Sequence, residues 1–442
     1  MKAISILLLL FYSLASAAQY SDLYKSSIDR GQALVKTLDD DFEDKEKFGD
    51  KLTSAEILLL RKGKITNSSE VADYPKALLN KVLQQVRTDA KIELYVYNDV
   101  GVNAYSLPNG SIYVTLGLLW AIDNEEELAF ILAHEVGHIV KSHGVISLLK
   151  EKSLSEQDED SYAGIYQQLQ FSKEQETEAD VFALEKIMDC SFNPELAIQA
   201  LKKISLDSNQ YTDPKFEDLV KDWEYKADTS KINKKVKKKE KEFEGVIFDD
   251  RFSTHPSTKK RLQMLTELIS KNKWEKESEN IDINEFEAFK EVVFREAMKY
   301  GQIGGEYGYS LYHLIQNIQS DEQYEYSEEL LIQQLYMICR YKEANSLTDV
   351  LSEENDGLKG STYNTFIQKW LNMSVDLCKE YAYNYCSVLL EGDENNEELV
   401  FWKAMMSEMY FGQVASKPNF KTYAKQFPNG AYISSVNSRL KD

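Results

Sequence analysis

Two histidines lie four residues apart inside an apolar segment, in the run ILAHEVGHIV from Ile131 to Val140. On a helix this spacing places His134 and His138 on one face, where both imidazoles can reach one metal ion. Glu135 lies roughly 100° around such a helix, so it can address a water on that ion without ligating it. These residue types at this spacing predict a zinc site that activates water.

A zinc ion that does chemistry needs a third protein ligand and one open coordination position. The candidate third ligand is Glu176, in the segment SKEQETEAD. With 5 histidines in 442 residues, a chance HExxH motif is expected in about one of a hundred such sequences. A buried, unpaired imidazole pair would be costly, whereas a metal satisfies both rings. A purely structural zinc site is disfavoured because it would leave Glu135 without a purpose.

The motif helix needs neighbouring elements that hold it in place. Residues 20–86 have a helical pattern with charged faces. Alternation of apolar residues then begins at Ile92, and Pro108-Asn109-Gly110 separates two extended segments, which predicts a small antiparallel sheet ending in a hairpin. Helical periodicity returns before the motif, and from about residue 281 helix follows helix with no strand pattern.

Four motifs occur in order along the chain: NAYSLPNGSIYVTLGLL, HEVGHIVKSHG, SKEQETEAD and FSTHPSTKKRL. Together they resemble peptidase family forty-eight, the zinc metallopeptidases of gluzincin type that include HtpX-type membrane proteases, CAAX prenyl endopeptidases and BepA-type proteases. The resemblance extends over about residues 74–268. It implies an α+β fold: a mainly helical gluzincin catalytic domain with a small antiparallel sheet, followed by an all-α helical-repeat domain as in BepA-type members.

The resemblance also implies roles for individual residues. It implies one zinc ion per chain, held by His134, His138 and Glu176. It implies Glu135 as the catalytic base and Asp180 as the residue that hydrogen-bonds a ligand histidine. His255, in a His-Pro motif, would either stabilise the oxyanion or, in a resting state, block the open coordination position.

Other positions near the motifs have less direct roles. Arg261 matches the family's arginine, and we expect it to form an ion pair rather than to take part in catalysis. Lys173 stands near the place where family members usually have arginine, a departure that affects a peripheral charge only. Glu178 is expected at a solvated helix position, and His143 at a helix end, because the ligand set is already full. The strand around residues 102–106 resembles the edge to which family substrates add as an extra strand.

The N-terminal run MKAISILLLLFYSLASAAQY predicts a secretory signal peptide, with a signal anchor as the alternative. It lacks a cysteine for lipidation, so we expect a periplasmic or secreted protein with no stable membrane span after cleavage. The predicted domain order is a signal peptide at 1–17, a helical lead-in at 18–73, a metallopeptidase domain at 74–272 with a basic insertion or lid at 226–244, and a helical, tetratricopeptide-like domain at 281–442. An irregular helical bundle is the alternative for the last segment.

The formal net charge of −21 repels phosphate backbones, so nucleic acid is not an expected partner. The predicted function is a zinc endopeptidase that cleaves envelope or secreted proteins during quality control or assembly, with partner proteins bound by the C-terminal helices. The alternative is a chaperone-like scaffold with a latent zinc site. Cys378 and Cys386 lie in one helical run, roughly 12 Å apart by helical rise, so any bonded partner lies elsewhere.

Overall fold

The computed structural model describes residues 21–38, 45–66, 68–151, 172–204, 216–220, 258–272, 283–320, 323–324, 326–351 and 360–441. The chain divides into two compact units. The first consists of Met1–Ser208 with Phe248–Phe294, and the second of Asn209–Ile247 with Arg295–Asp442. The predicted signal peptide, the basic insertion and His255 lie outside the described residues.

A three-stranded sheet lies within the first unit. Its strands are β1 (Glu93–Tyr97), β2 (Ala104–Ser106) and β3 (Ser111–Thr115), in the spatial order β1-β3-β2. Strand β3 pairs in parallel with β1 and antiparallel with β2. The predicted fold class is confirmed, but the sheet is mixed and not antiparallel as predicted.

The reason for the mixed sheet is the path of the loop after β1. This loop carries the chain past the position of β3, so the β2–β3 hairpin returns the third strand into the middle. The hairpin turn packs against the start of β1, where the Glu93 amide donates to the Gly110 carbonyl at 3.0 Å. Gly110 has φ +94°, and a Cβ there would lie 2.2 Å from the Lys91 carbonyl oxygen, so only glycine fits.

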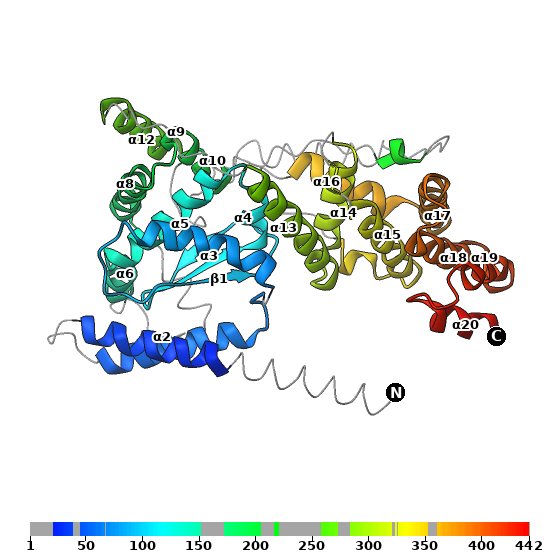
Figure 1. Cartoon of the computed structure of the whole chain (residues 1–442), viewed down its shortest axis with the longest axis horizontal. Coiled ribbons are helices and arrows are strands. Elements are labelled where there is room, and N and C mark those ends of the chain that lie inside the picture. The colour runs from blue at the N-terminus through cyan, green and yellow to red at the C-terminus, as the bar shows by residue number, and fades with distance from the viewer. Residues whose placement is uncertain are drawn as a thin grey trace. The chain divides into compact units, whose positions relative to one another are not determined.

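Helices cover both faces of this sheet (Figure 1). On one face, α2 (Lys45–Arg61) and the helical residues 21–37 pack against the tyrosines of β1 and β3. On the other, α3 (Ser69–Leu83) contacts β1, and α5 (Glu125–Val140) contacts β2 and β3. The sheet is therefore buried on both sides, with α5 held against it.

A buried carboxylate joins the first of these helical layers to the sheet. Glu56 on α2 is completely buried and accepts hydrogen bonds from Arg30 at 2.9 Å and from the Tyr113 hydroxyl at 2.9 Å. It also accepts from the Asn109 amide of the hairpin turn at 2.5 Å. Because a buried carboxylate is tolerated only when it is fully hydrogen-bonded, this network fixes the hairpin against α2.

The two edges of the sheet differ. The outer edge of β1 is covered by an antiparallel bridge from Ile65 to Tyr97, with the Thr66 amide donating to the Val96 carbonyl at 3.0 Å. Strand β2 has β3 as its only strand partner within the described ranges. Over the described ranges, β2 is therefore an edge strand of the sheet, and it lies next to α5.

Helix α5 is the most deeply buried helix near the site, with every residue from Glu126 to Ile139 buried. It begins at Asn124, whose side chain accepts from the Glu127 amide at 2.9 Å, and acidic residues fill its first turn. A helix that is buried all round needs neighbours on all sides. These are α3, α8 (Lys173–Asp189), α9 (Pro194–Ala197) and α10 (Ala200–Ile204).

The elements of the second unit are all helices, over the residues that the structure describes. They are η2 (Phe216–Leu219), the end of α13 (Ile283–Ile303), α14 (Tyr307–Ile318), α15 (Ser327–Glu343), η4 (Leu347–Asp349), α16 (Gly360–Asn372), α17 (Val375–Gly392), α18 (Glu397–Phe411), α19 (Gln413–Gln426) and α20 (Ile433–Lys441). From α17 onward each helix packs on the next. The tetratricopeptide-like character of these helices remains a prediction.

All four cysteines are free thiols. The Sγ atom of Cys378 on α17 lies 3.5 Å from that of Cys339 on α15, so the neighbour of Cys378 comes from another helix and not from Cys386. Across the ranges that the structure describes, no helix combines the length and the apolarity that a bilayer span requires.

Candidate metal centre

The site is built where α5 and α8 approach closely. Gly137, in the middle of the HEVGH run, faces Ala179 of the ETEAD run: a Cβ at Gly137 would lie 3.3 Å from the Ala179 Cα and 3.1 Å from the Phe182 ring. Two small residues at the crossing let the helix backbones come together. This close packing brings the acidic first turns of α8 against the histidines of α5.

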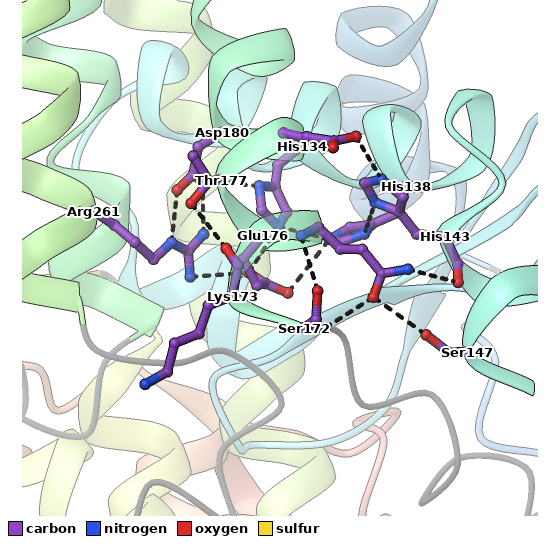
Figure 2. Close-up of polar contacts among 12 residues, drawn as sticks. His134, His138, His143, Ser147, Ser172, Lys173, Glu176, Thr177, Asp180 and Arg261 are labelled. Atoms are coloured by element: carbon purple, nitrogen blue, oxygen red, sulfur yellow. Dashed lines mark hydrogen bonds and ion pairs between the residues drawn. The ribbon is translucent and has the colours of Figure 1, made fainter. Parts of the chain in front are cut away.

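Three buried side chains converge at this crossing (Figure 2). His134 Nε2 lies 3.0 Å from His138 Nε2. The Glu176 carboxylate, which is completely buried, lies 3.5 Å from His134 Nε2 and 3.6 Å from His138 Nε2. Among the described residues, His134, His138 and Glu176 are the group of three potential metal ligands whose ligand atoms lie close together, within 4.8 Å of one another.

The donor set fits zinc. Zinc binds imidazole nitrogen and carboxylate oxygen at about 2.0–2.2 Å, so neighbouring ligand atoms of a tetrahedral site lie roughly 3.3 Å apart. The distances of 3.0, 3.5 and 3.6 Å lie on either side of that value. Two nitrogens and one oxygen leave a fourth position open, as a hydrolytic zinc site requires.

Glu135 supplies a second observation that fits a catalytic centre. Its side chain is 2% exposed, and its Oε2 has no hydrogen-bond partner among the described residues. A buried carboxylate oxygen without a partner is costly, so such an atom normally serves a ligand, a water or a reaction. An acceptor oxygen without a protein partner is what the role expected of Glu135 from the sequence would require.

The Asp180 carboxylate, which is ion-paired with Arg261, contacts the His134 ring on the side away from the metal position (Figure 2). Asp180 Oδ1 lies 3.0 Å from His134 Nδ1, so Nε2 is left to face the metal position. Arg261 on α12 (Thr258–Asn272) donates to both oxygens of Asp180, at 2.7 and 2.6 Å, and its Nη1 lies 3.1 Å from Glu176 Oε2. The ion pair predicted for Arg261 is confirmed, and it holds two of the site's carboxylates at once.

The electrostatics of this group follow from burial and pairing. Burial disfavours the charged form of His134, but Asp180 and Glu176 outweigh it and raise the pKa of His134 to about 9. Burial likewise opposes ionisation of Asp180, yet the hydrogen bonds from Arg261 and His134 outweigh it and lower the pKa of Asp180. Asp180 is thus an anion at neutral pH, and without a metal His134 holds a proton there.

His143 lies closer to the site than its sequence position predicts. It opens α6 (His143–Glu151), is 2% exposed, and its Nδ1 lies 3.0 Å from the Nδ1 of His138. Burial lowers the pKa of His143, which Glu178 partly offsets. His143 was expected near the end of the motif helix, but that helix ends at Val140 and His143 begins the next one. Its contact with a candidate ligand was not predicted.

The reason it was missed is the conformation of Ser142. This residue has φ 55°, a left-handed turn that residues other than glycine rarely adopt, and it folds the start of α6 back toward α5. Helical periodicity does not predict such a turn. The only signal in the sequence is the third histidine of HEVGHIVKSHG. The side chain of Glu178 is 57% exposed, as expected, but it also lies 3.3 Å from His143 Nε2.

A large part of the first unit matches a known family. Residues 72–157 and 161–269 match Peptidase family M48. The matched range contains both helices of the site, α5 and α8, and also the part of α12 that carries Arg261.

Three curated relatives are similar over shorter stretches. Mitochondrial metalloendopeptidase OMA1 of Arabidopsis thaliana is 25% identical over 186 residues, which are 40% of this chain and 31% of that protein. Mitochondrial metalloendopeptidase OMA1 of Schizosaccharomyces pombe is 32% identical over 145 residues, 28% of this chain and 42% of that protein. The mitochondrial metalloendopeptidase OMA1 of Bos taurus is 38% identical over 50 residues, 11% of this chain and 10% of that protein. The chain spans less than half the length of each.

These relatives correct the predicted location. A periplasmic or secreted protein was expected from the N-terminal apolar run, but that prediction is wrong, because the matched relatives are named as mitochondrial. The physical reason is that a basic residue followed by a short apolar run does not by itself define which translocation receptor reads it.

Proposed function

We propose that this chain, whose residues 72–269 belong to peptidase family M48 as its motifs predict, is a zinc-dependent endopeptidase. The observation that carries the proposal is the convergence of His134, His138 and Glu176 beside Glu135. The relatives named as metalloendopeptidases support the same reaction class.

When bound, zinc would act as a Lewis acid that lowers the pKa of water toward ~7 and polarises the scissile carbonyl. His134, His138 and Glu176 would hold it. Glu135 takes the proton of the attacking water on its buried Oε2 and passes it to the leaving amine. His255, which is outside the described residues, is proposed to stabilise the oxyanion or to gate the site.

The position of β2 at the end of the described strand order supports a proposal about substrate binding. An extended peptide that pairs with β2 would lie beside α5, because β2 and α5 are in contact. Pairing through the main chain needs an extended substrate and selects little for sequence. We therefore propose that the substrates are unfolded or misassembled proteins, so that the enzyme serves in protein quality control.

Two further proposals concern the context of the enzyme. The helices of the second unit are proposed to bind partner or substrate proteins, and the exposed Phe411 and Val414, 53% and 83% exposed, support a role at its surface. A mitochondrial location is proposed from the names of the three relatives. A fluorescent fusion of the full chain that stays outside mitochondria would contradict it.

The test of the reaction is the substitution Glu135→Gln in the purified chain. The amide keeps the size of the side chain and cannot accept the water's proton, so cleavage of an unfolded protein should fall about 10²- to 10⁴-fold. Zinc content should stay at that of the wild type because Glu135 is not a ligand. Cleavage is followed by gel and zinc by atomic absorption.

The matched control is Glu126→Gln, the same change on the same helix at a residue that is 3% exposed and lies in the first turn, away from the ligands. It should cleave like the wild type. If Glu135→Gln cleaved at the wild-type rate, Glu135 would not be the catalytic base. A wild type that holds zinc and binds unfolded protein but never cleaves it would favour the chaperone-like alternative.

A further inference from the structure

The two candidate histidine ligands differ in the group that the Nδ1 atom of each ring contacts, on the side away from the metal position. The Nδ1 of His134 faces a carboxylate, Asp180, at 3.0 Å. The Nδ1 of His138 faces a second imidazole, that of His143, also at 3.0 Å. A ligand histidine is usually oriented by whatever its outer nitrogen donates to, so the partner of His138 bears on the metal site directly.

The contact continues from His143 to the surface. His143 Nε2 lies 3.3 Å from Glu178 Oε2, on the exposed side of α8. A carboxylate only accepts hydrogen bonds, so His143 Nε2 carries the proton and His143 Nδ1 accepts. His138 Nδ1 then donates to His143, and the lone pair of His138 lies on Nε2, at the candidate metal position. The same rule does not place a proton on His138 Nε2, because Glu176 lies 3.6 Å away, beyond hydrogen-bond distance.

One tautomer of each ring is therefore consistent with the whole chain of contacts. It gives His138 the same orientation as His134, with Nδ1 protonated and directed outward and Nε2 directed at the metal position. The main chain of His143 is also held in place, because the Gln175 side-chain amide donates to the His143 carbonyl at 3.3 Å. Gln175 is in turn fixed by the capping box that it forms with Ser172.

We infer that His143 is a positioning residue for zinc binding, which holds His138 in the Nε2-coordinating tautomer and is itself oriented by Glu178. This inference rests on the proposed zinc site and adds His143 and Glu178 to the residues that support it. It requires no contact between His143 and the metal, because His143 acts through the His138 ring. The surface carboxylate Glu178 thereby acquires a role that its exposure alone does not indicate.

The experiment compares two substitutions of His143 in the full chain. His143→Leu fills the site without an acceptor, whereas His143→Asn places its side-chain oxygen close to the position of Nδ1. Zinc affinity is measured by competition with a chromophoric chelator. We expect His143→Leu to raise the zinc dissociation constant about 10- to 100-fold, and His143→Asn to recover most of that loss.

A purely structural role of His143 would give a different pattern, since both variants would then change affinity in proportion to their thermal stability without zinc. If His143→Leu does not fold, His143→Gln replaces it, because its oxygen matches the position of Nε2 and not that of Nδ1. The Gln variant should bind zinc more weakly than the Asn variant.

The surface end is tested with Glu178→Ala against Glu185→Ala, an exposed glutamate of the same helix. We expect zinc affinity to be about two- to fivefold weaker for Glu178→Ala, because a half-exposed contact contributes little. The zinc affinity of Glu185→Ala should equal that of the wild type. Equal zinc affinity of the wild type, His143→Leu and His143→Asn would overturn the inference while leaving the zinc site intact. A wild type that binds no zinc would overturn both the inference and the proposed function.

Discussion

At the scale of single residues, the ring of His134 lies between two acidic groups, Glu176 at Nε2 and Asp180 at Nδ1. Before a metal arrives, the two carboxylates favour a proton on this ring, and the pKa of His134 is raised to about 9. Zinc and this proton compete for the same nitrogen, because a ligand imidazole must be neutral at its coordinating atom. Arg261 limits the competition, since it neutralises part of the acidic charge.

The competition predicts how zinc affinity depends on pH. The pKa lies above neutrality, so below about pH 9 zinc must displace a proton from His134, and its apparent affinity should fall about tenfold for each unit that the pH is lowered. The dissociation constant is measured at pH 6, 7 and 8. Asp180→Asn, which removes one of the two acidic partners, should show a shallower dependence. An affinity that stays constant from pH 8 to pH 6 would show that zinc does not compete with a proton at His134.

Residue spacing alone predicts much of this site. The i, i+4 spacing of His134 and His138 and the neighbouring Glu135 depend only on helix geometry, so these positions follow from the sequence. Glu176 lies on another helix, and only the shared motif order connects it to them. The contact of His143 with His138 depends on the backbone of Ser142, which no side-chain pattern encodes.

At the scale of elements, the ligand set depends on how closely α5 and α8 approach. Ala179 presents its Cα to Gly137, and a backbone atom cannot rotate away as a side chain can. The motif residues between the ligands are thus as much a part of the site as the ligands, since they set the distance from Glu176 to the two imidazoles.

Gly137→Ala tests this dependence. The new methyl group gains about 1 kcal/mol of helix propensity, but it overpacks the crossing at a cost of about 1–3 kcal/mol, so the net loss of stability should be small. Displacement of α8 by a few tenths of an ångström should instead weaken zinc binding, by about tenfold or more. Zinc affinity and urea unfolding are measured on the same preparation.

Gly392→Ala is the control for that substitution. Gly392 also lies in a helix, α17, where a Cβ would meet nothing within 4 Å. The control should keep the zinc affinity of the wild type. If Gly137→Ala bound zinc as tightly as Gly392→Ala, the close approach of the helices would not be what positions Glu176.

The order of the elements was less predictable than their existence. Alternating apolar residues predicted the strands, and the Pro-Asn-Gly turn predicted the hairpin. The position of β1 beside β3 depends on a loop path and on the fit of Gly110 against Lys91, which are long-range contacts. Local patterns carry no information about such contacts, so the sheet was predicted as antiparallel.

At the scale of the whole molecule, the first unit contains the candidate metal ligands, and the elements of the second are helices only, over the ranges that the structure describes. We propose from this arrangement that the first unit carries out the chemistry and that the second unit binds partner proteins. The net charge of −21 remains consistent with protein substrates rather than nucleic acid.

We propose that this chain hydrolyses peptide bonds with one zinc ion held by His134, His138 and Glu176. The direct measurement is cleavage of an unfolded, casein-type protein by the full chain, before and after removal of metal with a chelator, together with its zinc content. We expect one zinc ion per chain, loss of cleavage on chelation, and recovery when one equivalent of zinc is restored. Cleavage that persists in the metal-free protein, or a chain that neither holds zinc nor cleaves when zinc is supplied, would contradict it.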